Sequence, residues 1–422
     1  MRILISAGEA SGEMYGAELI EALQRSASSQ TAELRSGTGE SPVPTRVARL
    51  EFFGVGGHRM RAAGCDTVVD AKNLSVVGIT EILGHLPKIY GLFHHLIQEA
   101  DKRRPDLAIV IDSPAFNWRV AREMKRRGVP VVYYVAPQFW AWRQGRVRLL
   151  RKYVDKALVI FPFEEEFYRK RGVDATFVGH PLAALERPAG DGAEYAARFQ
   201  LDSAKPWITL MPGSRVKEVR MNLPTILEAT AKLGAEYEYL LPVAPTLERS
   251  FVEGLIKKRS SGQHRITLVP ESPSALGHSR AGIIASGTAT VEAAMMGTPF
   301  VMVYRVSSLT YFLGRPRVKV PYFAMVNLIA GEEVVPELVQ HDFTATNVVS
   351  RLQEILPDGD ARSSMLEGLA KVKAKLRGPE GAAASPVQTS VQNLAGNSAR
   401  NPAERAAGII LSMGNCKKMS SG

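Results

Sequence analysis

The residues best suited to binding a nucleotide lie in the stretch Ala281–Tyr304. An apolar run stops at Ser286-Gly287-Thr288, a helix of small residues follows as far as Gly297, and a second apolar run completes a strand–turn–helix–strand unit. The unpaired amides at such a helix start form a cradle for phosphate, and Glu292 can accept hydrogen bonds from a sugar hydroxyl. The same residue types also begin many helices that bind nothing, so this stretch alone leaves both interpretations open.

A carboxylate suited to general-base catalysis follows another predicted strand. Asp106–Ile111 is apolar after its first residue and delivers Asp112 to its carboxyl end, ahead of the loop Ser113–Asn117. Ligands of open α/β sheets collect at the carboxyl ends of strands, which makes Asp112 a catalytic candidate. An aspartate in this position can instead cap the next helix, and the residues alone do not decide between these roles.

A third loop offers a partner for phosphate. The predicted strand Trp207–Met211 runs into Pro212-Gly213-Ser214-Arg215, and Glu218 follows. A guanidinium is suited to bidentate contact with phosphate. We therefore expect Arg215 to face whatever the loop binds.

A fourth loop, Pro137–Arg143, carries two tryptophans, Trp140 and Trp142. Large amphipathic rings of this kind stack on sugars or acyl chains, and they also fill cores. The sequence leaves both uses open.

These loops connect strands and helices that alternate along the chain. The predicted strands are Arg2–Ser6, Phe52–Val55, Asp106–Ile111, Val131–Val135, Ala157–Phe161, Thr176–Val178, Trp207–Met211, Tyr239–Val243, Ile266–Val269, Ile283–Ala285 and Phe300–Tyr304. Strands that alternate with helices favour parallel sheets. The predicted fold class is α/β, with two Rossmann-like domains whose parallel sheets face a cleft, and such a cleft is where substrates bind.

The length of 422 residues suggests two or three domains. We predict an N-terminal Rossmann-like domain over residues 1–181, interrupted at 26–46 by a polar, Ser/Thr/Pro-rich surface insertion. A second Rossmann-like domain is predicted over 182–377. Residues 378–422 are rich in Ala, Ser, Asn and Gly and are interpreted as a tail with a short helix around 403–413.

The composition, 45% hydrophobic and 23% charged, is that of an ordinary globular protein. No apolar run approaches the ~20 residues needed to span a bilayer, and a strand at the very start leaves no room for a signal peptide. Cys65 and Cys416 are too few for a metal cage. Asp358-Gly359-Asp360 fits a D-x-D metal pattern but follows a proline, so we interpret it as a turn and expect no metal site.

The net charge is +11, and much of it lies between Lys102 and Lys156. Such a surface attracts nucleic acid or an anionic membrane, and no nucleic-acid-binding module accompanies it. Upstream, Leu74–Ile97 is apolar on more than one face and is broken by glycines and a proline. It indicates either a core helix pair or an amphipathic surface that dips into a membrane. A charge run is also often just a solvated helix face.

Six sequence blocks follow one another along residues 1–352. They are G-E-A-S-G-E (Gly8–Glu13), D-S-P-A-F-N (Asp112–Asn117), P-Q-F-W-A-W-R (Pro137–Arg143), P-G-S-R…E (Pro212–Glu218), S-G-T-A-T-V-E (Ser286–Glu292) and N-L-I-A-G (Asn327–Gly331). Together, and in this order, they resemble the lipid-A-disaccharide synthase family. Any one block is a weak signal, whereas six in register are specific.

The resemblance implies a glycosyltransferase of the GT-B arrangement, with a metal-independent inverting reaction and no cofactor. UDP-2,3-diacylglucosamine would donate its sugar to 2,3-diacylglucosamine 1-phosphate, releasing UDP, as a step of lipid A synthesis. It also implies a cytoplasmic enzyme that associates peripherally with the anionic inner-membrane surface. Nucleic acid is not an expected partner, and a homodimer is one option for the oligomeric state.

Carried over residue by residue, the resemblance makes Asp112 the general base on the acceptor hydroxyl. The residues implied to bind nucleotide or substrate are Gly8, Glu9, Ser11, Asn117, Gly213, Ser214, Arg215, Glu218, Ser286, Gly287, Thr288, Ala289, Glu292 and Asn327. Arg215 and the four residues from Ser286 would hold the UDP phosphates, and Glu292 would hold the ribose. Asn327 would sit near the nucleotide, while Glu9 and Ser11 would line the cleft.

Two positions depart from the family pattern. Glu13 stands where the family commonly has Asp, and Val326 stands where Pro commonly precedes the asparagine. The first lengthens a side chain in the cleft turn, and the second affects the pose of Asn327. Neither changes the proposed base.

Two other functions remain open on the residues alone. One is another GT-B enzyme that uses UDP-sugars, such as the lipid II-forming transferase or a UDP-N-acetylglucosamine 2-epimerase. A nonlipid substrate gives no reason for the apolar stretch Leu74–Ile97, which disfavours the epimerase. The other is a non-catalytic, UDP-sugar-binding membrane adaptor, in which Asp112 would be a helix cap; measurable UDP release would exclude it.

Overall fold

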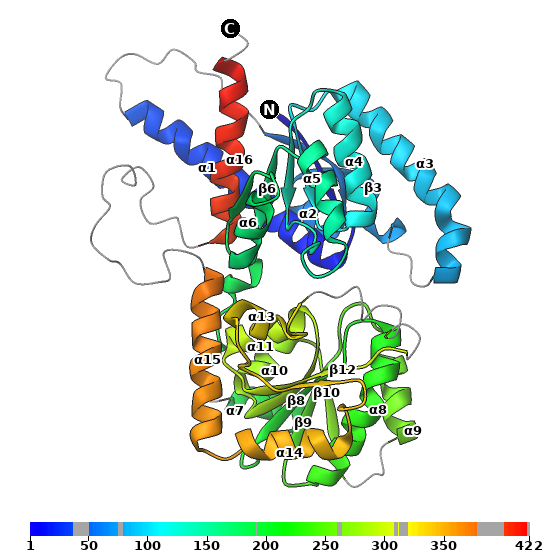
Figure 1. Ribbon diagram of the computed structural model, residues 1–422, viewed down its shortest axis with the longest axis vertical. Coiled ribbons are helices and arrows are strands. Elements are labelled where there is room, and N and C mark those ends of the chain that lie inside the picture. Colours follow the sequence, from blue (N-terminus) through cyan, green and yellow to red (C-terminus); the bar gives the residue numbers. More distant parts are fainter. Residues whose placement is uncertain are drawn as a thin grey trace. The chain divides into compact units, whose positions relative to one another are not determined.

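A computed structural model describes residues 1–36, 50–74, 79–190, 192–259, 264–307, 311, 320–377 and 401–419. The chain divides into two compact units. Unit 1 comprises Met1–Pro181 and Leu376–Gly422, and unit 2 comprises Leu182–Lys375. Each unit has its own parallel β-sheet with helices around it (Figure 1).

Unit 1 is built on a seven-stranded parallel sheet. Across the sheet its strands are β3 (Cys65–Asp70), β2 (Glu51–Gly56), β1 (Arg2–Ala7), β4 (Leu107–Ile111), β5 (Val131–Tyr134), β6 (Lys156–Val159) and β7 (Ala175–Phe177). The chain builds outward from β1 to β3 and then returns to add β4 on the other side of β1. The strand order therefore reverses between β1 and β4, and in open α/β sheets ligands bind at the carboxyl ends of the strands at such a reversal.

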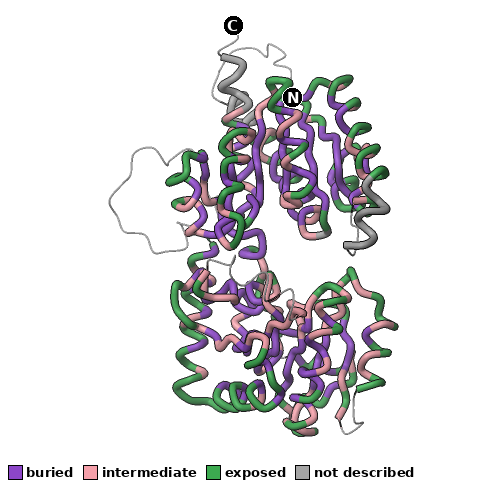
Figure 2. Tube along the Cα trace, turned by 45° about the vertical axis from the view of Figure 1, so that its right-hand side comes forward, coloured by how far each residue is buried: buried purple, intermediate pink, exposed green. Residues whose placement is uncertain are grey.

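Helices cover both sides of this sheet. They are α1 (Ala10–Ser36), α2 (His58–Ala62), α3 (Ile79–Arg103), α4 (Pro114–Arg126), α5 (Val147–Tyr153), α6 (Pro162–Arg169) and α16 (Pro402–Met419). The central strands are buried along their length, as Figure 2 shows, and β4 reads L-A-I-V-I without a polar residue. A continuous apolar run is typical of a parallel strand covered on both faces.

Unit 2 repeats the plan with six strands. Across the sheet they are β10 (Ile266–Val269), β9 (Glu238–Pro242), β8 (Trp207–Met211), β11 (Ala281–Ala285), β12 (Phe300–Tyr304) and β13 (Glu337–Val339). The helices are α7 (Ala193–Phe199), α8 (Val216–Leu233), α9 (Arg249–Arg259), α10 (Ser272–His278), α11 (Thr288–Met296), α13 (Met325–Ala330), α14 (Ala345–Ile355) and α15 (Asp360–Arg377). Here the strand order reverses between β8 and β11.

The α/β prediction is confirmed, and every predicted strand is present to within two residues. Two strands were not predicted. β3 carries Asp66, Thr67 and Asp70 at the edge of its sheet, and β13 is three residues long at the edge of the other. Neither has the apolar run on which the strand predictions rest.

Two segments differ locally from what the sequence suggests. The first part of the segment interpreted as a surface insertion, 26–46, is helical, because α1 continues through Ser36; residues 37–49 lie outside the described residues. The proposed core helix pair over Leu74–Ile97 is instead a single helix from Ile79 to Arg103, with Pro87 inside it. Residues 75–78 of that stretch are not described.

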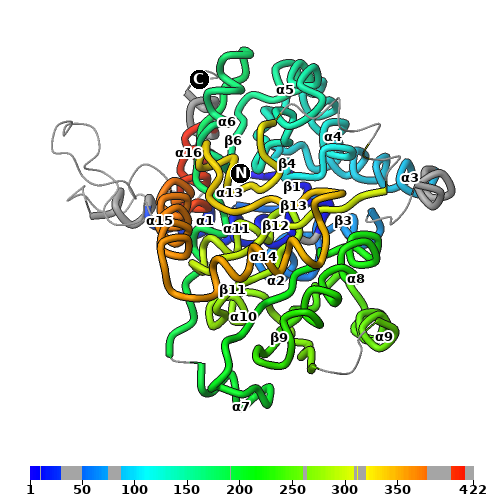
Figure 3. Tube along the Cα trace, turned by 60° about the horizontal axis from the view of Figure 1, so that its bottom comes forward, coloured from blue at the N-terminus to red at the C-terminus, as the bar shows by residue number. Residues whose placement is uncertain are grey.

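The C-terminal helix α16 belongs to unit 1, where it lies beside α1 (Figure 3). Arg405 secures it by donating from Nε to the Val178 carbonyl at 2.8 Å and from Nη2 to the Arg377 carbonyl at 2.6 Å. Sequence reasoning predicted a short helix here but not that the chain returns to its first unit. None of the helices described here has the length and hydrophobicity of a membrane-spanning segment.

Candidate active site

Two of the predicted site loops meet in unit 1. Gly8–Glu13 follows β1 and Asp112–Asn117 follows β4, so the two loops flank the reversal of strand order. A Cβ on Gly8 would lie only 2.6 Å from the Ser113 hydroxyl oxygen. A side chain at position 8 would force the Ser113 side chain to move, and the close approach places the start of α1 directly against the loop that carries Asp112.

The backbone at Asp112 is in an unusual conformation. Asp112 and Ser113 both have left-handed φ angles, 46° and 45°, and Val135 at the end of the neighbouring β5 has a φ of 55°. Left-handed conformations cost a residue other than glycine on the order of 1–3 kcal/mol, and they concentrate at functional sites. Their presence at the ends of two adjacent strands supports a functional site at this edge.

Asn117 does not face a ligand as expected. It is fully buried, and its Nδ2 donates to the carbonyls of Ile111 at 2.8 Å and Asp112 at 2.9 Å. Its Oδ1 accepts from the Ser6 hydroxyl at 2.7 Å. Asn117 therefore ties the ends of β1 and β4 together, which is a supporting role; its predicted contact with substrate stays a prediction.

The carboxylates of the first loop differ in their surroundings. Glu13 accepts from the Arg59 amide at 2.8 Å, and its carboxyl oxygen lies 2.4 Å from where a Cβ on Gly57 would be. Its longer side chain therefore caps the start of α2. Glu9 is exposed and Ser11 is half-buried, so both remain able to meet a ligand.

The two tryptophans of the fourth loop lie in different environments. Trp140 is buried, and its Nε1 donates to Glu164 at 2.7 Å, so it fills the core. Burial raises the pKa of Glu164 to about 7, while Trp140 and two backbone amides donate to its carboxylate. Trp142 is 46% exposed and lies beneath the Arg143 guanidinium, 4.2 Å from the ring centre. Only Trp142 is open to an external partner.

The remaining site loops meet in unit 2. Pro212–Glu218 follows β8 and Ser286–Glu292 follows β11, and these strands are paired, with Ile284 opposite Met211. Both loops thus lie at the carboxyl ends of adjacent strands at the second reversal of strand order. The predicted nucleotide residues other than Asn327 are brought to this one edge.

The helix start predicted to cradle phosphate is formed by fewer residues than expected. Ser286 donates its amide to Val303 at 3.0 Å and its hydroxyl to the Phe323 carbonyl at 2.8 Å, so both of its donors serve the fold. Gly287 is the N-cap residue just before α11, with a φ of 134°, and it has no side chain to cap the helix. The first amides of a helix have no acceptor within it, which leaves Gly287, Thr288 and Ala289 as the cradle.

Glu292 lies one turn into α11 and accepts a short hydrogen bond from the hydroxyl of Ser272, the first residue of α10. Burial raises its pKa, and the Ser272 hydrogen bond partly opposes that shift. A carboxylate held in this way keeps a fixed direction and has a second oxygen with which to accept a hydroxyl.

Glu218 is committed to its own loop. Its carboxylate accepts from the amides of Ser214 at 3.1 Å and Arg215 at 3.3 Å, and it pairs with the Arg215 guanidinium at 3.0 Å. A Cβ on Gly213, where φ is 125°, would lie 2.7 Å from it. In the structure Glu218 thus has a capping role, and contact of Ser214 and Glu218 with a ligand stays a prediction. The Arg215 side chain is 69% exposed.

Asn327, which was predicted to sit near the nucleotide, is fully buried. Its Nδ2 donates to Glu337 at 2.9 Å, and its Oδ1 accepts from the Val335 amide at 3.0 Å. Glu337 in turn accepts from the Phe323 amide at 2.8 Å, and the Phe323 carbonyl holds Ser286. Asn327 thus supports the phosphate-cradle turn from behind.

Three residues in these sites were missed by sequence reasoning. Tyr133 donates to the Asp112 carbonyl at 2.8 Å, Ser272 holds Glu292, and Glu337 links Asn327 to the turn. Tyr133 could have been noticed in the sequence, because it is one of two tyrosines in an otherwise aliphatic buried strand, V-V-Y-Y. Glu337 lies in a strand that was not predicted, and nothing local marked it.

In the D-x-D stretch, Asp358 and Gly359 form a bend, as predicted, and Asp360 is the first residue of α15; Asp358 pairs with Arg280 at 2.6 Å. Among the described residues there is no group of three His, Cys, Asp or Glu side chains placed to hold a metal ion.

Comparison with known proteins decides the family. The family model for lipid-A-disaccharide synthetase matches residues 3–387. The chain belongs to this family. A lipid-A-disaccharide synthase of Koribacter versatilis is 48% identical over 417 residues, 99% of this chain and all of that protein. One of Myxococcus xanthus is 39% identical over 396 residues, 93% of this chain and 97% of the other.

Solved structures share the fold at low identity. A glycosyltransferase of kitacinnamycin superposes with a TM-score of 0.58 at 14% identity, covering 97% of this chain and 98% of the other. A UDP-GlcNAc 2-epimerase from Neisseria meningitidis, bound to UDP-GlcNAc, gives 0.56 at 12% identity, covering 98% and 99%. The chain is a glycosyltransferase with the GT-B fold. The resemblance stated from the six blocks is confirmed, and the epimerase alternative is set aside because its likeness is one of fold alone.

Proposed function

We propose that the chain transfers the sugar of UDP-2,3-diacylglucosamine to a hydroxyl of 2,3-diacylglucosamine 1-phosphate, yielding the tetra-acylated disaccharide 1-phosphate and UDP. The observation that carries this proposal is the family match over residues 3–387, together with relatives that bear the name lipid-A-disaccharide synthase. The geometry is consistent with it, since each unit presents a polar site where its strand order reverses.

Unit 2 binds the UDP half of the donor in this proposal. The amides of Gly287, Thr288 and Ala289 meet the diphosphate at a helix N-terminus, where the helix dipole favours negative charge. Arg215 adds its guanidinium, and Glu292 accepts hydrogen bonds from the ribose. Ser286, Glu218 and Asn327 hold these groups in place from within the fold.

Unit 1 supplies the base. Asp112 takes the proton of the acceptor hydroxyl as that oxygen attacks the anomeric carbon. The bond from this carbon to the UDP oxygen breaks, and its electron pair leaves with the diphosphate. Inversion follows from this direct displacement.

The proposal is tested by incubating the full chain with both acylated substrates in detergent micelles. Mass spectrometry should detect the tetra-acylated disaccharide 1-phosphate, and UDP should form in equal amount. Hydrolysis of the donor alone, with no disaccharide, would point to a different acceptor. Absence of both products would contradict the proposal.

Metal removal gives a separate prediction. In the proposed mechanism the helix amides and Arg215 neutralise the negative charge of the leaving diphosphate, so no metal ion is needed for this. EDTA at about a thousandfold excess over trace metal, enough to bind all of it by mass action, should therefore leave turnover unchanged. Turnover is followed as UDP release before and after chelation. Loss of turnover that Mg²⁺ restores would overturn the metal-independent assignment.

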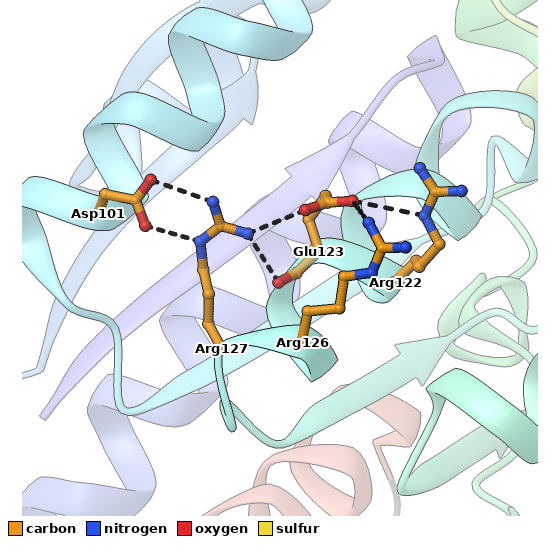
Figure 4. Close-up of polar contacts among 5 residues, drawn as sticks. All are labelled: Asp101, Arg122, Glu123, Arg126 and Arg127. Carbon is orange, nitrogen blue, oxygen red and sulfur yellow. Dashed lines mark hydrogen bonds and ion pairs between the residues drawn. The ribbon is translucent and has the colours of Figure 1, made fainter.

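We further propose that unit 1 docks on an anionic membrane surface through α5 and the turn before it. The basic surface predicted from sequence separates into two parts. Around the C-terminal ends of α3 and α4 cations are paired with carboxylates: Arg127, just after α4, meets Asp101 through Nε at 2.6 Å, and Glu123 binds Arg126 and Arg127 at 2.9 and 3.0 Å (Figure 4). Ion pairs of this kind leave little charge for an external partner.

The second part carries excess positive charge. Residues 143–153 contain no acid, and for five cations there the described residues provide no salt-bridge partner: Arg143, Arg146, Arg148, Arg151 and Lys152. Burial and the neighbouring charge of Arg143 lower the pKa of Arg146, as expected for crowded cations. The exposed Trp142 stands beside them, and an indole ring next to basic side chains suits the headgroup region of a bilayer.

Two charge-matched double variants test this surface. Arg148→Gln with Arg151→Gln should weaken binding to phosphatidylglycerol vesicles by about 30-fold, since each basic residue near an anionic surface contributes about 1 kcal/mol. Lys102→Gln with Arg126→Gln removes the same charge from paired positions and should change binding by less than about 3-fold. Binding is read by vesicle sedimentation. If both double variants lost the same vesicle affinity, the loss would depend only on net charge, and this would contradict the assignment of the membrane surface to α5.

The apolar part of the membrane hypothesis concerns Leu74–Ile97, and its test replaces Val76, Val77, Ile79 and Ile82. Val76 and Val77 lie outside the described residues, and the side chains of Ile79 and Ile82 are not described. Further along α3, Tyr90 is 66% exposed. Changing the four aliphatic residues to Ser should raise the soluble fraction without lowering the melting temperature; a lowered melting temperature would identify them as core residues.

A further inference from the structure

The backbone at Asp112 needs to be held. Two consecutive residues other than glycine, Asp112 and Ser113, are left-handed, with φ angles of 46° and 45°. This conformation is disfavoured and persists only where surrounding contacts fix it. The direction of the Asp112 side chain depends on it, because the side chain leaves from the same α-carbon.

Two buried donors converge on one atom of this backbone. The Asp112 carbonyl oxygen accepts from the Tyr133 hydroxyl at 2.8 Å and from Asn117 Nδ2 at 2.9 Å. The Asp112 amide donates to the Tyr134 carbonyl at 3.3 Å. Tyr133 is a residue of β5 and is 1% exposed, so its ring cannot follow if the loop relaxes. Its hydroxyl is therefore a fixed hydrogen-bond donor that holds the peptide group following Asp112.

The adjacent tyrosine provides an internal comparison. Tyr134 is equally buried in the same strand, yet its hydroxyl has no hydrogen-bond partner among the described residues. Burying an unsatisfied hydroxyl costs free energy, whereas a bonded one is compensated. Of two neighbouring buried hydroxyls, only the one on Tyr133 is bonded to the candidate catalytic residue.

We infer that Tyr133 is a positioning residue for catalysis, whose hydroxyl holds the Asp112 backbone so that the carboxylate is aimed at the acceptor. The inference rests on the proposed role of Asp112 as base. Tyr133 donates to the backbone carbonyl of Asp112, so it acts on the orientation of that residue. Electrostatics agrees with this proximity, since burial and then the charge of Asp112 raise the pKa of Tyr133.

The test compares Tyr133→Phe with Tyr134→Phe, each of which removes one buried hydroxyl. Tyr133→Phe should lower kcat by about 10- to 100-fold with little change in KM for the donor, because a small misplacement of a reacting group costs this much. Tyr134→Phe should keep kcat within about 2-fold, and its melting temperature should not fall. Equal effects of the two changes on kcat, or an unaltered kcat in Tyr133→Phe, would overturn the inference.

A rescue experiment separates positioning from general stability. Glycine adopts the left-handed conformation without penalty, so adding Ser113→Gly to Tyr133→Phe should recover part of the lost kcat. In an Asp112→Asn background, Tyr133→Phe should have no further effect, since there is no base left to aim. Full additivity with Asp112→Asn, or no recovery with Ser113→Gly, would contradict positioning. An inactive wild-type chain would instead mean that the proposed function itself has failed.

Discussion

Replacing Asp112 with Asn should lower turnover by about 100-fold or more while the fold and the affinity for UDP are retained. A sugar hydroxyl is a poor nucleophile near neutral pH, and a positioned base typically contributes ~10²–10⁴-fold to the rate. Asn keeps the size of the side chain but cannot take a proton. The kcat is measured by UDP release, and UDP affinity by calorimetry.

The matched control is Glu9→Gln. Glu9 is the other carboxylate that sequence and structure leave available in the same loop cluster, since Glu13 is committed to capping α2. If Asp112 is the base, Glu9→Gln should reduce kcat far less than Asp112→Asn does. Near-normal turnover in Asp112→Asn, or loss of folding in that variant, would remove Asp112 from the catalytic role and make Glu9 the residue to test.

Replacing Glu292 with Ala should weaken UDP binding by about 10- to 100-fold and change kcat at saturating donor much less. A hydrogen bond to a charged group contributes about 1.5–3 kcal/mol, which corresponds to this range of affinity. A ribose contact is present in both the ground state and the transition state, so its loss appears mainly in binding. Unchanged UDP affinity would exclude Glu292 from the nucleotide site.

The raised pKa of Glu292 adds a second measurement. Burial favours the protonated carboxyl, which has fewer lone pairs free to accept ribose hydroxyls. UDP affinity should therefore fall as the pH falls through that raised pKa, and Glu292→Gln should remove this part of the pH dependence. Ser272→Ala is the companion variant, since it frees the carboxylate without removing it.

The strands and the polar ends of strands were predictable because both are local patterns. The apolar runs that become β4 and β11 are legible in sequence, and so are the polar residues immediately after them, Asp112 and Ser286. Parallel strands then bring those ends to one edge of a sheet. This is enough to place the two candidate sites.

What could not be predicted is which polar residues of a motif turn inward. Asn117, Glu218 and Asn327 belong to the motifs, but the fold uses them to hold backbone. A sequence motif identifies a set of residues that occur together. It does not indicate which of them contact a ligand and which support the residues that do. Buried contacts between distant segments decide that, as with Asn327 and Glu337.

The return of α16 to unit 1 was unpredictable for a similar reason. Pro402–Met419 is an ordinary helical pattern, and its partner surface on α1 lies nearly four hundred residues earlier in the chain. Arg405 reaches the Val178 carbonyl, a contact across 227 positions. No local signal records such a pairing.

In the proposed mechanism an acceptor hydroxyl, deprotonated by Asp112, displaces UDP directly. The most direct test is the anomeric configuration of the new glycosidic bond, determined by proton NMR on the disaccharide made by the wild-type chain from a donor of known configuration. Direct displacement predicts inversion, with the opposite configuration to the donor in all of the product. Retention of configuration would require a different mechanism and would contradict the role assigned to Asp112.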